Sequence, residues 1–388
     1  MAGFWRLVTQ ITGWHIAASM CFYAIYAGTP LFRDAFDLTG VTVGWLIASM
    51  TLGYAVFQIP VGYLTDRFGE HLLLTVGLLG LSTFLLISII SPSYPILLLV
   101  LFFLGSMYGT AVPGTNKAIF DNIAEGRQHS AIGIKSIGSP IGSAMSAIIV
   151  TSFVGIVVWY LGFLIVISIG FITAGLFYLT YSGASRAAAT PPDFRGLLAN
   201  IPLLVLFLAG ICIGSAYYTS VGFTVLYVNE SLGAAVAVGG VILAILQIAS
   251  STGKIVVGWL ADTLPGEPQF AIASILIVQT IAGGLLFVFV GTISSTYTAG
   301  VVFFLLGMTA LGSTGLYYSL ISILVSDAEI GSASAVGSLA TTSSGLFAPP
   351  AFGYLVDTVN YSVAWGFLGM ILFLAAAFVT VVLILIRD

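Results

Sequence analysis

Charged residues are scarce in this chain: Asp, Glu, Lys and Arg make up 6% of its 388 residues, whereas 59% are hydrophobic. Soluble domains contain about a quarter charged residues, so this chain has too few to cover a surface in water. The net charge of −4 and the lack of any basic run argue against a nucleic-acid partner. We therefore expect lipid to be the solvent for most of the chain.

Residue patterns typical of enzymes and metal proteins are also missing. The two cysteines, Cys21 and Cys212, both lie in apolar segments, where they favour packing roles, although a disulfide between them stays possible. Metal-ligand spacing, a nucleophile–base pair and a phosphate-binding loop are absent. We expect no cofactor, no metal and no catalytic activity.

Long apolar runs are what the chain does contain. A spanning helix needs about 20 apolar residues, and hydropathy with Gly, Pro and charge punctuation predicts an all-α membrane protein. The N-terminal MAGFWRLVTQITGWH lacks a small-residue cleavage site, so we expect it to lead into the first span instead of being a removed signal. The twelve predicted spans are 10–28, 40–63, 71–90, 95–119, 130–156, 157–181, 200–228, 235–260, 269–291, 296–325, 330–356 and 360–386.

The arginines predict the orientation of these spans. An even number of spans puts both termini on one side, and cytoplasmic loops retain Lys and Arg. With the N-terminus inside, Arg33 alone falls outside, whereas the cytoplasmic segments contain Arg6, Arg67, Arg127, Arg186, Arg195 and Arg387. We expect a multi-pass protein of the cell membrane with cytoplasmic termini.

The longest polar interruption, SGASRAAATPPDFRG (182–196), divides six spans from six. An ordinary long loop would leave the two sides unrelated, but IPVGYLTDRFGEH (59–71) resembles IVVGWLADTLPGE (255–267). A weaker similarity links SAIGIKSIGS (130–139) with SASAVGSLATTS (332–343). We therefore predict two bundles related by a parallel repeat, over 1–181 and 200–388, joined by a cytoplasmic linker at 182–199.

The motif GYLTDRFG resembles the signature between helices 2 and 3 of the major facilitator superfamily. It keeps Gly62, Asp66, Arg67 and Gly69 but has Glu70 and His71 where the family has further basic residues. The stretches NKAIFDNIAEGRQHSAIGIKSIGSPIGSA and GSASAVGSLATTSSGLFAPPAFGYLVD are similar to cyanate-like or organic-anion carriers of this superfamily. The resemblance implies two pseudo-symmetric six-helix bundles that rock around a central cavity.

The motif residues are candidates for a latch between the halves. At a helix end, Asp66 can accept hydrogen bonds from a helix terminus of the other half, and Arg67 and Arg127 can pair across the seam. Alternatively, Arg67 only sets the topology. The glycines favour close helix approach and a tight turn. The predicted gating set is Gly62, Asp66, Arg67, Gly69, Arg127, Gly258 and Asp262.

Basic residues within the spans are candidates for ligand binding, because a charge at membrane depth is costly. Lys254 lies eight residues before Asp262, about 12 Å into the membrane, and the matching residue in the first half is Gln58. By resemblance, monocarboxylate and oxalate carriers have a basic residue at this place, although Lys254 could instead snorkel to the surface. Lys135 could contact substrate or snorkel. His15 is either a satisfied polar group or a proton site.

Polar and aromatic residues near mid-depth outline the predicted cavity. Adjacent tyrosines such as Tyr217 and Tyr218 cannot both face it, and some tyrosines could be packing residues. No Asp or Glu falls in the middle of a predicted span, which leaves exchange, facilitated transport, or co-transport through His15 or the substrate's own proton. The predicted substrate-binding set is Lys254, Tyr26, Tyr23, Tyr108, Tyr217, Gln247, Tyr317 and Gln58.

We therefore predict a monomeric secondary transporter that moves a small organic anion by alternating access, with a proton or counter-substrate as the coupled species. One alternative is export of an uncharged or lipophilic compound, in which case Lys254 would be structural. Another is a transport-inactive receptor or scaffold on the same fold, which would lack a continuous polar cavity.

Overall fold

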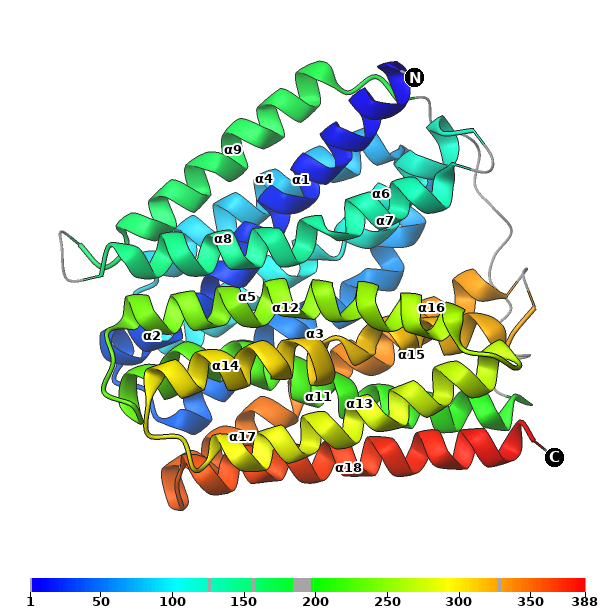
Figure 1. Ribbon diagram of the computed structural model, residues 1–388. Helices are drawn as coiled ribbons and strands as arrows, with labels where there is room; N and C mark the ends of the chain where they lie inside the picture. The colour runs from blue at the N-terminus through cyan, green and yellow to red at the C-terminus, as the bar shows by residue number, and fades with distance from the viewer. Residues whose placement is uncertain are drawn as a thin grey trace.

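The computed structural model describes residues 2–124, 127–154, 158–183, 197, 199–326 and 329–387, and its regular structure there is helical (Figure 1). The N-terminal half consists of α1 (Ala2–Ala27), α2 (Thr29–Phe36), α3 (Gly40–Phe68), α4 (Glu70–Ile89), α5 (Tyr94–Tyr108), α6 (Ala111–Asn122), α7 (Gln128–Ser136), α8 (Gly138–Ser152) and α9 (Leu161–Thr180). The C-terminal half consists of α11 (Ile201–Glu230), α12 (Val236–Thr263), α13 (Pro268–Val290), α14 (Thr296–Leu306), the π-helix η1 (Gly307–Leu311), α15 (Ser313–Ile323), α16 (Ile330–Ser343), the 3-10 helix η2 (Ser344–Leu346), α17 (Ala348–Thr358) and α18 (Tyr361–Leu385). The predicted linker at 182–199, with Arg186 and Arg195, lies almost wholly outside the described residues.

Ten helical stretches of the described chain are long and apolar enough to cross a membrane. Two more, α1 and the interrupted α16–α17 stretch, correspond to the first and eleventh predicted spans. The ends agree with the predicted ones to within a few residues, except that α1 begins at Ala2, well before the predicted residue 10. The short helix α2 was not predicted. The predicted all-α, twelve-span fold is confirmed.

Several spans are interrupted near their middle. The helix breaks at Ile137, between α7 and α8, and again at η2, just before Pro349 and Pro350. Pro lacks a backbone N–H and clashes with the preceding turn, which accounts for breaks close to Pro140, Pro349 and Pro350. The π-helix η1 and the α5–α6 break at Gly109 had no predicted counterpart.

The two halves lie one above the other and pack against each other through several pairs of helices (Figure 1). We call the end of the bundle where both termini lie the terminal face and the opposite end the distal face. Between the halves, α8 packs against α12 and α3 packs against α17. Both pairs depend on small residues: a Cβ on Gly44 of α3 would lie 2.5 Å from the Pro349 carbonyl oxygen.

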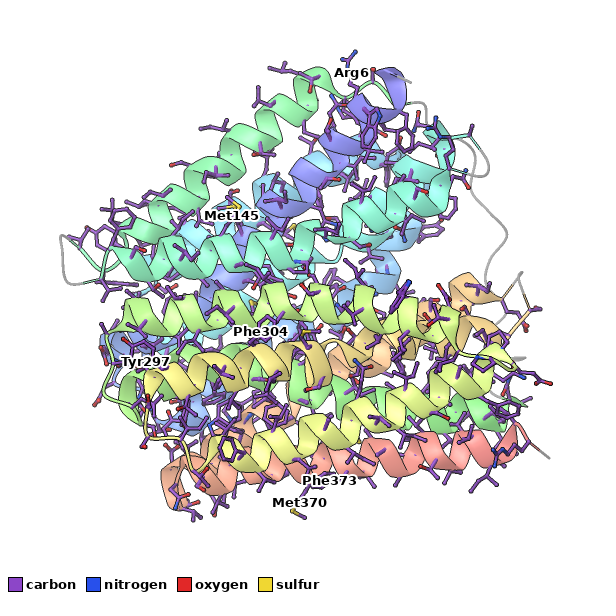
Figure 2. The ribbon with its side chains drawn as sticks, in the orientation of Figure 1. Arg6, Met145, Tyr297, Phe304, Met370 and Phe373 are labelled. Atoms are coloured by element: carbon purple, nitrogen blue, oxygen red, sulfur yellow. The ribbon has the colours of Figure 1, made fainter. Side chains whose placement is uncertain are left out.

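Large apolar side chains cover the outside of the bundle. Tyr297 is 89% exposed and Met370 is 70% exposed, and both point away from the helices (Figure 2). Such a surface would be unstable in water but matches the hydrocarbon of a bilayer. Backbone polar groups must be satisfied internally in lipid, which is why helices account for the described spans.

Candidate functional site

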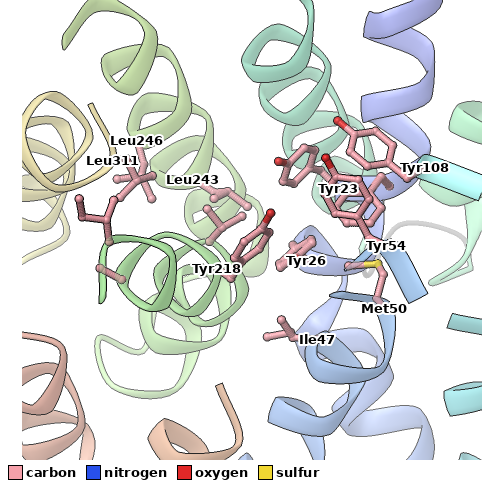
Figure 3. Packing of buried hydrophobic residues seen from close by; sticks show 14 of the residues in the cluster. Tyr23, Tyr26, Ile47, Met50, Tyr54, Tyr108, Tyr218, Leu243, Leu246 and Leu311 are labelled. Atoms are coloured by element: carbon pink, nitrogen blue, oxygen red, sulfur yellow. The ribbon is translucent and has the colours of Figure 1, made fainter. Parts of the chain in front are cut away.

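Six buried or partly buried tyrosines gather where the two halves meet, and we call them the central tyrosine cluster. Figure 3 shows Tyr23, Tyr26, Tyr54, Tyr108 and Tyr218 turned toward a common region. Four of the six had been predicted as substrate-binding residues. The cluster consists of Tyr23 and Tyr26 on α1, Tyr54 on α3, Tyr108 on α5, and Tyr217 and Tyr218 on α11.

Hydroxyl contacts and ring stacking hold this cluster in place. The Tyr23 and Tyr217 hydroxyls lie 3.1 Å apart and so join the two halves. The Tyr108 hydroxyl is 2.9 Å from Ser19 Oγ, and its ring stacks on Phe22 with centroids 4.1 Å apart. The Tyr26 hydroxyl is buried and has no hydrogen-bond partner among the residues that the structure describes. An unpaired buried hydroxyl is costly, so Tyr26 has an unused donor and acceptor for a ligand.

Neighbouring tyrosines behave differently on α11 and α15. Tyr217 contacts Tyr23, while the Tyr218 hydroxyl lies 3.4 Å from Thr342 Oγ1, so both belong to the cluster and the expectation that adjacent tyrosines cannot both face inward is wrong. Both can do so because the cluster lies between several helices: Tyr217 reaches Tyr23 on α1, and Tyr218 reaches Thr342 on α16. Tyr317 is fully buried and donates to the Gly337 carbonyl oxygen at 3.2 Å.

This placement puts Tyr317 in the packing between α15 and α16, not in the central tyrosine cluster. Its neighbour Tyr318 is the more exposed of the two and lies 3.4 Å from Thr341 Oγ1. Tyr54 was not among the predicted site residues. It precedes Gln58 by four residues, so both lie on one face of α3, and that spacing could have identified it.

Two glutamines join the halves directly. Gln247 on α12 donates to Ser143 Oγ on α8 at 2.5 Å, and Gln58 on α3 donates to Ser338 Oγ on α16 at 2.8 Å. Their side-chain carbonyl oxygens are buried and accept no hydrogen bond from the described part of the chain. Both predicted glutamines therefore lie at the seam between the halves, each with one free acceptor.

Lys254 lies on α12, nine residues before its last residue. It is partly buried, and its ammonium makes no hydrogen bond or ion pair with any residue that the structure describes. Its stem packs on α15, where a Cβ on Gly315 would lie 3.1 Å from Lys254 Cγ. Lys254 is thus a positive charge at membrane depth with no acidic partner among the described residues.

A second lysine, Lys135 on α7, is more deeply buried, with 3% of its surface exposed. Its ammonium donates to Thr115 Oγ1 at 3.1 Å and to Asn116 Oδ1 at 2.9 Å, both on α6. It does not snorkel to the surface. His15 on α1 is within electrostatic range of Lys135, is 4% exposed, and has a ring nitrogen, Nδ1, without a partner.

The predicted gating residues lie at the terminal face. Gly69 has φ = 84° and links α3 to α4, which confirms the tight turn expected there. Asp66 pairs with Lys117 of its own half at 3.9 Å, and its side chain is 45% exposed. Gly62 lies near Pro113, while Gly258 has open space around it and Asp262 is exposed without a hydrogen bond or ion pair in the described part of the chain.

The two arginines of the gating set contact aromatic rings of their own half. The Arg67 guanidinium lies 5.3 Å from the Phe68 ring centroid, and that of Arg127 lies 4.6 Å from the Phe4 centroid. These are cation–π distances. In this conformation neither arginine spans the seam.

Glu70 and His71, where the sequence departs from the family motif, connect the turn to the end of α9. The Tyr181 hydroxyl donates to Glu70 Oε1 at 2.9 Å, and His71 Nε2 is 3.1 Å from the Tyr178 carbonyl oxygen. Burial, with a contribution from the Glu70 carboxylate, raises the pKa of Tyr181, so its phenol remains a donor. The departure therefore reinforces the N-terminal half.

The distal face differs, because polar contacts cross the seam there. The Asp357 carboxylate on α17 accepts hydrogen bonds from Gly40 N at 2.7 Å and Val41 N at 2.8 Å, the first two backbone N–H groups of α3. Arg33 and Glu230 form an ion pair at 2.9 Å. A nearby hollow of about 640 Å³ is lined by Arg33, Glu230 and Asp357 among others. This hollow lies at the distal face beside the contacts that join the halves, and its lining includes no residue of the central tyrosine cluster. We therefore do not regard it as the substrate site.

Among the described residues, His, Cys, Asp and Glu form no group of three that could hold a metal ion. Cys21 and Cys212 are free and buried. The disulfide that the sequence left possible is therefore not formed.

Comparison with known proteins agrees with this architecture. The chain is 24% identical over 359 residues to the hexuronate transporter of Bacillus subtilis (strain 168), covering 86% of this chain and 83% of that transporter. It is 25% identical over 348 residues to the 3-(3-hydroxy-phenyl)propionate transporter of Escherichia coli (strain K12), covering 85% and 83%. It is 23% identical over 373 residues to the probable sulfoacetate transporter SauU of Cupriavidus necator, covering 90% and 86%.

Solved structures with the same fold include a bacterial homologue of the human lysosomal transporter Spinster, with a TM-score of 0.76 at 17% identity over 99% of this chain and 96% of that one. The nucleoside transporter NupG matches with a TM-score of 0.77 at 15% identity over 98% and 99%. Residues 14–349 match the profile of the Major Facilitator Superfamily. This chain therefore belongs to the major facilitator superfamily and is a multi-pass membrane transporter.

Proposed function

We propose that this chain carries small organic anions across a membrane by alternating access. The observation that supports this most is Lys254, a positive charge at membrane depth without an acidic partner among the described residues. An unpaired ammonium that is partly buried at membrane depth is disfavoured, and a substrate carboxylate would satisfy it. The transporters of hexuronate, hydroxyphenylpropionate and sulfoacetate that resemble this chain are named for organic acids.

The central tyrosine cluster and the two seam glutamines supply the remaining contacts in this proposal. The Gln58 and Gln247 carbonyl oxygens and the Tyr26 hydroxyl are buried without partners, so they can bind hydroxyl groups of a substrate. The aromatic rings can pack on its carbon skeleton. Lys254 lies seven residues beyond Gln247, about 10 Å nearer to the terminal face.

The arginine distribution supports cytoplasmic termini, so in this proposal the terminal face is the cytoplasmic one. Polar contacts join the halves at the distal face in this conformation, so in the proposal the site is reached from the cytoplasmic side. Substrate entering from there would meet Lys254 before the tyrosines. When the halves rock, Asp66 would leave Lys117 and meet a helix end of the C-terminal half, as the motif's latch role requires.

Transport of radiolabelled carboxylates into proteoliposomes tests this proposal. Lys254→Gln should lower kcat/KM for a transported anion roughly 10- to 100-fold, the range for losing a hydrogen bond to a charged group. Lys254→Arg should retain part of the activity, because it keeps the charge but changes the shape of the donor. Thermal unfolding of each variant controls for folding.

Wild-type rates in Lys254→Gln would contradict the organic-anion assignment. Export of an uncharged or lipophilic compound would then be the leading function, with Lys254 as a structural residue. Binding without any transport in the wild-type protein would instead favour a receptor.

A further inference from the structure

The two lysines that lie inside the membrane region come from opposite halves, on α7 just before α8 and on α12, and α8 packs against α12. Gln247 of α12 bonds Ser143 of α8, and a Cβ on Gly240 would meet Thr151 and Ala147. Residue numbers therefore rise along α8 as they fall along α12, so these helices are antiparallel. Lys135 lies eight residues from Ser143 and Lys254 lies seven residues from Gln247, both toward the terminal face. At 1.5 Å per residue, the two levels differ by only about 2 Å.

Lys135 is positioned by neutral groups alone. Its two hydrogen bonds to described residues go to the Thr115 hydroxyl and the Asn116 amide oxygen. An ammonium has three N–H donors, so one remains for another acceptor. Nearby, His15 Nδ1 is buried without a partner. A buried ammonium that is oriented by neutral hydrogen-bond partners and keeps one N–H donor unused can bind an anionic oxygen.

The ion pairs of the described chain leave both lysines uncompensated. Those pairs are Arg33–Glu230 at the distal face and Lys117 with Asp66 and Asp121 at the terminal face. Lys135 and Lys254 therefore add two positive charges to one level of the membrane region, one from each half. Like charges at one level repel, and the repulsion grows when the halves close on the terminal side. An anion with two negative charges would neutralise both.

We propose that Lys135 is a second substrate-binding residue and that Lys135 and Lys254 together form a site for a small dianion, such as a dicarboxylate. The inference deepens the proposed function and rests on it, because it assumes that organic anions bind between the halves. Lys254 binds one acidic group from the C-terminal half. Lys135, oriented by Thr115 and Asn116, binds the second from the N-terminal half.

Matched probes that differ in one charge test this site. Succinate and butyrate have four carbons each, as glutarate and valerate have five, and only the first member of each pair has a second carboxylate. Calorimetry on the purified chain in nanodiscs measures the affinity for each of the four probes. For whichever dicarboxylate binds more tightly, we expect an affinity at least tenfold higher than that of its matched monocarboxylate. Lys135→Gln should remove that preference while changing monocarboxylate affinity less than twofold. Lys135→Arg should keep most of it.

The control variant is Arg6→Gln, which removes a cation from the terminal face, where Arg6 bonds the Thr180 carbonyl oxygen. It should leave the preference unchanged. The unfolding temperature in lipid, measured without ligand, separates misfolding from lost recognition, and Lys135→Met provides a second neutral variant if Lys135→Gln is unstable.

The outcomes separate the two proposals. If monocarboxylates bind as tightly as their dicarboxylates, or if Lys135→Gln weakens both probes equally, the two-lysine site is wrong while the anion carrier survives. If no carboxylate binds the wild-type protein, or if Lys254→Gln binds all probes normally, the proposed function fails and this inference fails with it.

Discussion

The two faces of the bundle hold the halves together in different ways. At the distal face, backbone atoms of α3 approach Pro349 and Gly353 closely, and Asp357 caps the first two N–H groups of α3. Toward the terminal face, the last described hydrogen bond between the halves is Gln58 to Ser338, eight residues before Asp66. Beyond it, Asp66, Arg67 and Glu70 find partners in their own half. The difference teaches that close backbone packing joins the two halves at the distal face. At the terminal face, the polar side chains bond only within their own half, among the described residues.

The largest effect should come from disturbing the main-chain fit. A Cβ on Gly44 would lie 2.5 Å from the Pro349 oxygen and 2.5 Å from Pro350 Cα, and backbone atoms cannot move aside cheaply. Gly44→Ala should prevent full closure of the distal face and lower transport at least tenfold. Cysteine-labelling rates at distal positions should rise.

Gly366→Ala is the matched control, because a Cβ there meets nothing within 4 Å. It should transport normally. Equal labelling of Gly44→Ala and Gly366→Ala would show that α3 and α17 separate too easily for their packing to close the distal face.

An intermediate effect is expected from the helix cap. Asp357→Ala removes the acceptor of two N–H bonds, and a charged hydrogen-bond partner contributes about 1.5–3 kcal/mol, less for an exposed group. We expect a shift of about 1–2 kcal/mol toward distal-open molecules, or roughly 5- to 30-fold in the ratio. Pulsed electron spin distances across the distal face would measure it. Asp34→Ala, an exposed carboxylate on the same face, should not change those distances.

The smallest effect should come from the terminal face. Asp66 is exposed and its pair with Lys117 is long, so Asp66→Asn should hardly change the conformation described here. It should instead weaken the opposite state, in which the latch forms, by about 1 kcal/mol. The same spin-label distances should show a modest gain of terminal-open molecules. A gain of terminal-closed molecules, or the same shift with Glu267→Gln, would contradict the latch.

The number and limits of the spans could be predicted from the sequence because lipid enforces a simple rule of length and polarity. Gln58, Gln247 and four tyrosines of the central cluster could also be identified, since polar groups at mid-depth are rare. The direction in which each side chain points could not be predicted. Tyr317 and Tyr318 are adjacent, and only packing decides which of them lies in the core of the C-terminal half. Lys135 could not be distinguished from a snorkelling lysine, because Thr115 and Asn116 come from another helix. The role of Asp357 at the distal face depends on the approach of α17 to α3. Local sequence patterns do not predict such a contact between distant segments.

The capped distal face also makes the two sides of the membrane unequal for a ligand. A site reached only through a minor conformation binds with an apparent affinity reduced in proportion to the fraction of molecules in that conformation. If the bonds of Asp357 and the fit at Gly44 favour the closed distal face by about 1.4 kcal/mol, roughly one molecule in ten is receptive on that side at any moment. The same chemical site would then show about tenfold weaker apparent affinity for substrate arriving from the distal side, with no change in any residue that touches the substrate.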